Sequence, residues 1–228
     1  MKPKILLSWS SGKDSAWALH ILRRQGEYEI AGLVTTVNSA FDRVAMHSTR
    51  RELVEQQAEA AGLSLRVVDL PWPCSNADYE RLMKTMCDEA AAQAITGFAF
   101  GDLFLADIRA YRERMLQGTG LEPIFPLWQQ PTRALAREMI AAGLRAKLVC
   151  VDPAKLAPEF VGRDFDEKLL DDLPPGVDPC GENGEFHSFV YAGPMFRREI
   201  PVVAGERVQR DGFWFCDVVP DKMAAPTS

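Results

Sequence analysis

The stretch that decides the fold is "ILLSWSSGKDSAWALHIL", residues 5–22. Its apolar run stops at Ser8, small and charged residues follow through "SSGKDS", and an apolar, helix-favouring segment then begins. A glycine-containing turn from a buried strand into a helix exposes backbone N–H groups at the positive end of the helix dipole, and this geometry binds phosphate. Gly12 allows close backbone approach, and Lys13 adds a mobile positive charge. We therefore predict a phosphate-binding loop between the first strand and the first helix.

Strand-like and helical patterns alternate along the chain up to about residue 150. Several strand-like runs are continuously apolar, as in parallel strands that are buried on both faces. The helical segments carry apolar residues at helical spacing, and Asn76 is the expected N-cap of one of them. This alternation predicts an α/β fold with a doubly wound parallel sheet of the Rossmann-like kind. The predicted strands are 5–9, 30–37, 65–70, 94–101 and 146–151, and further predicted helices are 50–62, 76–92 and 131–143.

The pattern changes after about residue 150. Residues 151–182 are rich in Pro, Asp and Gly, which predicts a loop with one helix near 164–172. Short strands follow, with turns expected at Ala204-Gly205 and Asp211-Gly212. These features predict a smaller C-terminal α+β part with antiparallel hairpins. We divide the chain into an N-terminal domain, 1–130, and a C-terminal subdomain, 131–228.

Composition narrows the classes of protein that the chain can represent. The 228 residues carry a formal net charge of -6, so an extended basic surface for nucleic acid is not expected. No apolar run approaches the ~20 residues of a membrane-spanning helix. The five cysteines include no C-x-x-C pair, which fits reduced thiols in the cytoplasm rather than a disulfide framework or a structural zinc site.

Two well-known phosphate loops do not match the opening stretch. A Walker A loop would need glycine where Leu7 stands and Ser or Thr where Asp14 stands, and a dinucleotide fingerprint would need three glycines. "SSGKDS" instead resembles the S-G-G-x-D-[ST] loop of the PP-loop ATP pyrophosphatases, with Ser11 in place of the first glycine. A serine adopts positive φ only at a cost. The resemblance implies an adenine nucleotide alpha-hydrolase type of fold and cleavage of ATP between its α and β phosphates.

Five stretches narrow the resemblance to one branch of that superfamily. In chain order they are "LLSWSSGKDSAWAL", "MHSTRRELVEQQAEAAGL", "FGDLFLADIRAYRERM", "EPIFPLW" and "GENGEFHSFVYAGP". Together they resemble the diphthine–ammonia ligase family over about residues 5–194. The family implies ATP-dependent amidation, in which a carboxylate becomes an acyl-adenylate, pyrophosphate leaves and ammonia displaces AMP. "GENGEFHSF" is similar to the bacterial branch, and bacteria make no diphthamide, so the resemblance implies the chemistry but not the family's named substrate.

Physical roles can be assigned to residues within these motifs. Asp14 would coordinate Mg²⁺, which prefers a carboxylate together with phosphate oxygens. Thr35 lies close to the end of the second strand, near the switch point where doubly wound sheets bind nucleotides. A carboxylate in "GENGEFH" would bind an incoming ammonium ion and take its proton. The expected site residues are Lys13, Asp102, Glu182 and Glu185 for catalysis; Ser10, Ser11, Gly12, Lys13, Asp14, Ser15, Thr35, His47 and Gly101 for nucleotide binding; and Asn183 and His187 for substrate binding.

Structural interpretations compete for several of these residues. The opening loop would also fit an ordinary polar turn, Asp14 and Asp102 would each also serve as a helix cap, and "GENGEFH" would also fit a solvated turn. His20 lies inside the first helix and is expected to pack in the core. The arginines of "RAYRERM", residues 109–115, are interpreted as a solvated helix face rather than a substrate clamp.

Two other functions stay open. The first is RNA modification by the same ATP chemistry, which would be accompanied by a basic surface and a cysteine pair that this sequence does not show. The second is a non-catalytic ATP sensor of the universal-stress-protein kind, which generally lacks a Lys-Asp loop. For the leading function the expected partners are ATP, ammonia or an ammonia donor, and an acceptor carboxylate on a small molecule or a protein side chain. A homodimer is left open, and neither a membrane nor a nucleic acid is expected.

Overall fold

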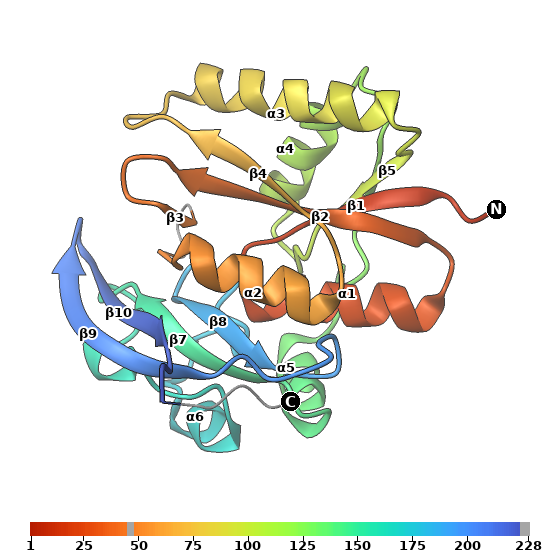
Figure 1. Ribbon diagram of the computed structural model, residues 1–228. Coiled ribbons are helices and arrows are strands. Elements are labelled where there is room, and N and C mark those ends of the chain that lie inside the picture. Colours follow the sequence, from red (N-terminus) through yellow and green to blue (C-terminus); the bar gives the residue numbers. More distant parts are fainter. Residues whose placement is uncertain (45–47, 224–228) are drawn as a thin grey trace.

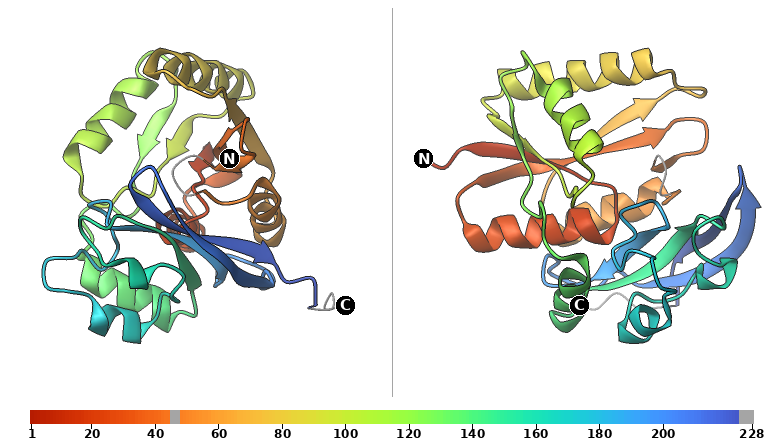
Figure 2. Two further views of the ribbon diagram at one scale, coloured as in Figure 1. Left: turned by 90° about the vertical axis from the view of Figure 1, so that its left-hand side faces the viewer. Right: turned by 180° about the vertical axis from the view of Figure 1, so that it is seen from behind.

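The computed structural model describes residues 1–44 and 48–223, and its two sheets lie in separate layers (Figure 1). From top to bottom in that view, helices α3 and α4 cover sheet A, α1 and α2 separate sheet A from sheet B, and α5 and α6 cover the outer face of sheet B (Figures 1 and 2). The helices are α1 Lys13–Gln25, α2 Arg51–Ala61, α3 Asn76–Ala92, α4 Ala106–Leu116, α5 Thr132–Ala141 and α6 Glu167–Asp172, with a 3-10 turn η1 at Pro158–Phe160.

Sheet A is the predicted doubly wound parallel sheet. Strands β2 and β4 lie on one side of β1, strands β5 and β6 lie on the other, and only the short β3 runs antiparallel, against the end of β2. The chain therefore reverses its direction of winding at β1, and nucleotides bind at such a switch point. The strands of sheet A are β1 Lys4–Ser8, β2 Glu29–Asn38, β3 Arg43–Val44, β4 Leu65–Leu70, β5 Gly97–Ala99 and β6 Glu122–Ile124.

Alternate residues of β1 pack into the hydrophobic cores on opposite faces of sheet A. Ile5 and Leu7 belong to the core cluster that contains Trp17 of α1, whereas Leu6 belongs to the cluster under α3 and α4. Successive strand residues point to opposite faces, so a continuously apolar strand fits only between two covered faces. The first of these clusters also includes Leu148 of sheet B, which means that α1 is buried on both sides.

Sheet B corrects part of the sequence prediction. The strand predicted at 146–151 exists, but it runs antiparallel between β8 and β10 and does not continue the parallel series. The turn expected at Ala204-Gly205 is wrong, because both residues lie inside one long strand, whereas β9 and β10 do join at Asp211-Gly212. Both residues of that turn have positive φ, as a two-residue hairpin turn requires. The strands of sheet B are β7 Arg145–Val151, β8 Phe186–Ala192, β9 Val202–Arg210 and β10 Phe213–Pro220.

Some element boundaries also differ from the prediction. Ser75, not Asn76, caps α3, because its side chain accepts a hydrogen bond from the backbone N–H of Asp78. The strand predicted at 94–101 shortens to β5, and its last predicted residues form an irregular segment at the edge of the sheet. In the described part of the chain, no helix combines the length and the apolar composition that a bilayer crossing requires.

Candidate functional site

The loop between β1 and α1 holds one residue in a left-handed conformation. Ser11 has a φ of 70° and is fully buried. Its hydroxyl lies 2.8 Å from the Thr49 hydroxyl, and its carbonyl accepts hydrogen bonds from Val190 N–H at 3.0 Å and Gln57 Nε2 at 3.1 Å. Three contacts from distant elements therefore stabilise a backbone conformation that a serine adopts at a cost of roughly 1–2 kcal/mol.

The serines beside it shape the start of α1. Ser10 Oγ accepts from Gly12 N–H at 3.3 Å and lies 3.2 Å from Ser15 Oγ, which donates to the Gly12 carbonyl at 3.0 Å. The segment after β5 approaches the same helix end closely, because a Cβ on Gly101 would lie 2.8 Å from the carbonyl carbon of Asp14. A glycine is therefore required at position 101, where two sheet-edge segments meet.

Lys13 links this loop to the C-terminal part of the chain. Its Nζ donates to Asp14 Oδ2 at 2.8 Å and to the Cys180 carbonyl, and it lies 5.3 Å from the Phe186 ring centroid. Its backbone N–H donates to Ser188 Oγ at 3.1 Å. The side chain is 3% exposed, so the charge lies in the interior, between segments that are more than 160 residues apart in the chain.

Three segments enclose a polar cavity of about 380 Å³ around Lys13. They are the segment 8–15 from the end of β1 into α1, the stretch 100–112 from the end of β5 into α4, and the segment 180–188 from the loop before β8 into that strand. We call this space the polar cavity. It lies at the carboxyl ends of β1 and β5, which is the switch point of sheet A.

The carboxylates of Asp14, Asp102 and Glu182 face the polar cavity from these three segments. Glu182 Oε1 accepts from Leu103 N–H at 2.8 Å. Burial raises the pKa of Glu182 to about 7, and the charge of Asp14 adds to the rise. Burial likewise raises the pKa of Asp102, even though the guanidinium of Arg112 lies 3.6 Å from its Oδ2. Glu182 and Asp102 therefore change protonation state at a higher pH than ordinary carboxyl groups do.

Lys13 keeps its proton in this setting. Burial acts to lower the pKa of Lys13, but the charge and hydrogen bond of Asp14 and the charge of Glu182 outweigh it, so the pKa lies above its ordinary value. His187, which also lines the polar cavity, has a pKa lowered to about 4 by burial and by the charge of Lys13. At neutral pH the polar cavity thus contains a cationic lysine beside a neutral imidazole.

A second cavity of about 330 Å³, lined by a larger share of apolar and aromatic residues, adjoins the first, and we call it the apolar cavity. The two share Ser8, Ser10, Phe100 and Arg112, and the apolar cavity is completed by side chains such as Val34, Thr36, Met83 and Phe98. The prediction of a solvated face over residues 109–115 is wrong for Arg112, because it lines both cavities and its guanidinium stacks 5.1 Å from the Phe100 ring.

The structure brings most of the predicted site residues together. Thr35 is not among them: it is buried on the strand face opposite Thr36, and only Thr36 lines the apolar cavity. His47 lies outside the described residues. Ser11 and Gly12 contribute backbone geometry rather than lining. Those that line the polar cavity are Ser10, Lys13, Asp14, Ser15, Gly101, Asp102, Glu182 and His187.

Glu185 and Asn183 lie behind the lining of the polar cavity. Glu185 is 3% exposed, and its Oε1 accepts from Asp178 N–H at 2.9 Å and from Asn183 Nδ2 at 3.2 Å. The Asn183 carbonyl in turn accepts from Lys155 Nζ at 2.8 Å. These contacts fix the shape of the loop that carries Glu182, so the two residues position the loop.

Sequence reasoning missed Arg112 and Ser188 as cavity residues. Arg112 lies within "RAYRERM", which was interpreted as a solvated helix face, and Ser188 directly follows the "GENGEFH" segment. Arg112 lies one helical turn after Ile108 on α4, and both line the polar cavity, so its place in the helix that follows Gly101-Asp102 is the signal that could have indicated it.

The donor set of the polar cavity fits a hard metal ion only in part. Among the described residues no group of three or more His, Cys, Asp or Glu side chains is arranged to hold a metal by itself. Asp14 Oδ1 and Asp102 Oδ2 are nevertheless buried without a hydrogen bond. Oxygens of this kind suit Mg²⁺, which binds proteins through one or two carboxylates plus phosphate oxygens and water.

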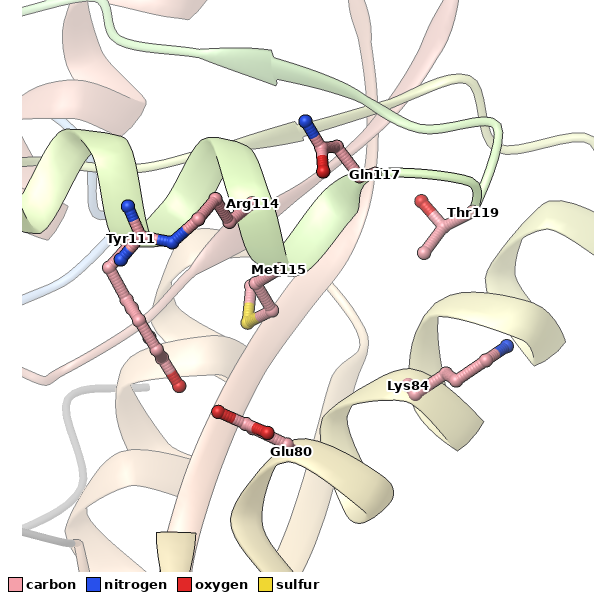
Figure 3. Close-up of a pocket in the computed structure, with 7 residues that line it drawn as sticks. All are labelled: Glu80, Lys84, Tyr111, Arg114, Met115, Gln117 and Thr119. Carbon is pink, nitrogen blue, oxygen red and sulfur yellow. The ribbon is translucent and has the colours of Figure 1, made fainter. Parts of the chain in front are cut away.

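A further hollow of about 380 Å³ lies apart from this site, between α3 and α4. Figure 3 shows Tyr111 and Glu80 pointing toward one another across it. It shares no lining residue with the polar cavity or the apolar cavity. Its lining contains none of the predicted site residues, so we place the candidate site at the switch point of sheet A.

Comparisons with known proteins cover both parts of the chain. A family model described as the diphthamide synthase N-terminal domain matches residues 1–123, and one described as the diphthamide synthase C-terminal domain matches residues 131–221. A relative named diphthine–ammonia ligase from Danio rerio is 28% identical over 220 residues, which are 87% of this chain and 86% of the relative.

Mammalian relatives of the same name match over a shorter span. The Homo sapiens protein is 29% identical over 153 residues, 64% of this chain and 57% of its own length, and the Rattus norvegicus protein is 30% identical over the same shares. The chain thus spans less than two thirds of these relatives' length. The N-terminal family model alone covers more than half of the residues, and together the two family models account for both sheets. The chain therefore belongs to the diphthamide synthase family.

Proposed function

We propose that this chain is an ATP-dependent ligase that activates a carboxylate as an acyl-adenylate and passes the acyl group to ammonia. The observation that carries the proposal is the convergence of Lys13, Asp14, Asp102 and Glu182 in one cavity at the switch point of a doubly wound sheet. A site that binds only a base or a sugar would not need a buried lysine beside the carboxylates of Asp14 and Glu182.

The nucleotide would occupy both cavities. The adenine ring fits the apolar cavity, where Met83 and Phe98 line the walls, and the triphosphate fits the polar cavity beside Lys13. Arg112 lines both and would contact the α phosphate at the junction. Asp14 Oδ1 and Asp102 Oδ2, which are buried without a hydrogen bond, would hold Mg²⁺, and the ion would neutralise charge on the departing pyrophosphate.

In the first step an acceptor carboxylate oxygen attacks the α phosphorus, and the bond from that phosphorus to the β-phosphate oxygen breaks. In the second step ammonia attacks the acyl carbon, and AMP leaves with the bonding electrons. Glu182 would take the proton that the attacking nitrogen loses, since a general base works best when its pKa lies near the working pH. The N-terminal domain 1–130 would then bind ATP, and the subdomain 131–228 would complete the site and bind the acceptor.

Sulfur transfer to RNA, the other enzymatic function, is less well supported. Burial raises the pKa of Cys180 far above its ordinary value, and a thiolate is the form that attacks. All five cysteines are free, which suits the reducing cytoplasm that we propose as the location. No specific observation favours a non-catalytic sensor.

Product analysis tests the proposal. ATP labelled at the α phosphate is incubated with the protein, Mg²⁺, ammonium and a panel of carboxylic acids, and the labelled nucleotides are separated. We expect AMP, with an equal amount of pyrophosphate, to accumulate over many turnovers when an accepted acid is present. ADP as the sole nucleotide product would contradict the proposal, and tight ATP binding without turnover on any acid would favour a sensor.

A further inference from the structure

A third cavity, of about 360 Å³, lies between the loops of sheet A and the β9–β10 hairpin. Its lining includes the aromatic side chains of Phe41, Trp72, Phe213 and Phe215. We call it the aromatic pocket. It adjoins the candidate site, because His187 lines both the aromatic pocket and the polar cavity, and Val44 lines both the aromatic pocket and the apolar cavity.

The sheet A side of the aromatic pocket exposes two large rings. Trp72 is 62% exposed and Phe41 is 53% exposed, and their ring centroids lie 5.3 Å apart in an edge-to-face arrangement. Most large apolar side chains of the described residues are buried, so two adjacent exposed rings on one pocket are a departure that usually marks a binding site. The rings supply flat apolar walls for a ligand.

The floor of the aromatic pocket is one row of sheet B. His187, Cys150 and Phe215 are register partners across β8, β7 and β10, and directly opposed residues point to the same face. Adjacent strands lie about 4.8 Å apart, so His187 and Phe215 stand on the order of 10 Å from each other. A ligand on this floor therefore spans about the length of a ring with two short arms.

The hairpin end of the aromatic pocket carries a cation. Arg210 pairs in register with Phe213, stacks 4.9 Å from the Phe215 ring and donates to Ser48 Oγ at 3.1 Å. It forms no ion pair with an acidic side chain in the described part of the chain, whereas the neighbouring Arg43 is held by Asp217 at 2.8 Å. The lining includes one acidic residue, Asp211, which is exposed at the turn. The charge available to a ligand at this end is positive.

We infer that the aromatic pocket binds the acceptor, a small molecule with a flat, ring-bearing body and an acidic group at each end. This inference rests on the proposed function. One carboxylate reaches past His187 to the polar cavity and is the group that is adenylated. The ring lies against Trp72 and Phe215, and the second anion pairs with Arg210.

Calorimetry with three probes tests this inference without ATP. The probes are 1,4-phenylenediacetate, a ring-bearing diacid; phenylacetate, which lacks the second acid; and adipate, which lacks the ring. We expect the ring-bearing diacid to bind at least about tenfold more tightly than either of the others. Arg210→Gln should remove the advantage of the diacid over phenylacetate, and Trp72→Ala should weaken both ring-bearing probes about tenfold, with ATP affinity unchanged in each variant.

Arg207→Gln is the matched control, since Arg207 lies on the same strand but does not line the aromatic pocket. The inference is overturned if the three probes bind equally, if none binds at millimolar concentration, or if Arg207→Gln has the same effect as Arg210→Gln. Diacid binding without any AMP formation from ATP would count against the proposed function alone. Normal ATP binding with no diacid binding would count against the aromatic pocket alone.

Discussion

Two loops meet in the polar cavity, and they contribute in different ways. The loop of residues 8–15 has its geometry fixed by hydrogen bonds among its own serines and to Thr49 and Gln57. The segment 180–188, which is the loop before β8 and the first residues of that strand, supplies the groups with shifted pKa values, Glu182 at about 7 and His187, on β8, at about 4. In the proposed function the first loop binds the phosphates of ATP, whereas burial of the second shifts the pKa values of the groups that would move protons. The contrast predicts that changes in the two loops will affect different measurements.

The largest effect is expected at Lys13, where the two loops join. Lys13→Met keeps an unbranched apolar stem but removes the charge that contacts Asp14 and the Cys180 carbonyl. We expect weaker ATP binding and a turnover that falls about 10²–10³-fold, the usual cost of losing one preorganised charge at a developing anion. Calorimetry for ATP and a pyrophosphate release assay would measure the two changes.

Lys84→Met is the control for Lys13→Met. Lys84 pairs with Asp88 at 2.7 Å on an exposed face of α3 and does not line the polar cavity. Both ATP affinity and turnover should therefore stay at wild-type values. If Lys13→Met behaved like Lys84→Met, Lys13 would be a structural anchor between the loops and not part of the nucleotide site.

The second effect separates binding from reactivity within the later loop. Glu182→Gln keeps the acceptor oxygen for Leu103 N–H but removes the ionisable group. Acceptor-dependent pyrophosphate and AMP release should fall about 10²-fold, the lower range for a lost general base, whereas ATP affinity should change little. The pH–rate profile should lose its rise near pH 7, and this loss would not follow from a merely structural role.

Glu185→Gln sharpens the same comparison. Because Glu185 lies behind the lining of the polar cavity, we expect its main effect on stability, and a smaller fall in turnover than Glu182→Gln gives. Equal losses of turnover at both positions, or a larger loss at Glu185, would mean that loop shape and not the ionisation of Glu182 limits the reaction.

The sequence predicted the first loop far better than the second. The order strand, "SSGKDS", helix is local, so it determined sheet A, the switch point and the position of Lys13. Glu182 accepts from Leu103, which is 79 positions away, and no pattern within "GENGEFH" indicates that Glu182 faces the polar cavity while Glu185 faces Asp178. The antiparallel pairing of β7 was missed for the same reason, since a continuously apolar strand is compatible with either kind of sheet.

The third effect concerns stability against pH in the absence of ligand. The folded pKa of Glu182, about 7, lies above its ordinary value of 4.5, so the folded state binds the proton more tightly. Its contribution is full below pH 4.5 and is lost as the pH rises through 7. We expect the free energy of unfolding of the wild type, relative to Glu182→Gln, to fall by about 1–2 kcal/mol between pH 5 and pH 8, after allowance for partial solvent screening.

Urea unfolding of both proteins at several pH values would measure this difference. His187 acts in the opposite sense, because its lowered pKa removes stability as the pH falls from 6.5 toward 4, but it titrates in both proteins and cancels in the comparison. A difference that is constant with pH would show that Glu182 is ionised throughout, and it would remove the physical basis for its role as a base.

The smallest effect is expected in the loop of residues 8–15, at Ser11. Ser11→Ala loses the hydrogen bond to Thr49 but keeps the Cβ that opposes a φ of 70°, whereas Ser11→Gly loses the bond and the opposition together. The glycine variant should therefore be more stable than the alanine variant by about 1 kcal/mol in urea unfolding. At Ala16, inside α1, glycine should instead destabilise by about 1 kcal/mol or more, because φ there is helical. If Ser11→Gly and Ser11→Ala proved equally stable, the positive φ of residue 11 would not be strained, and the hydroxyl with its partners would determine the shape of the loop. The proposed difference between the two loops would then not hold for residues 8–15.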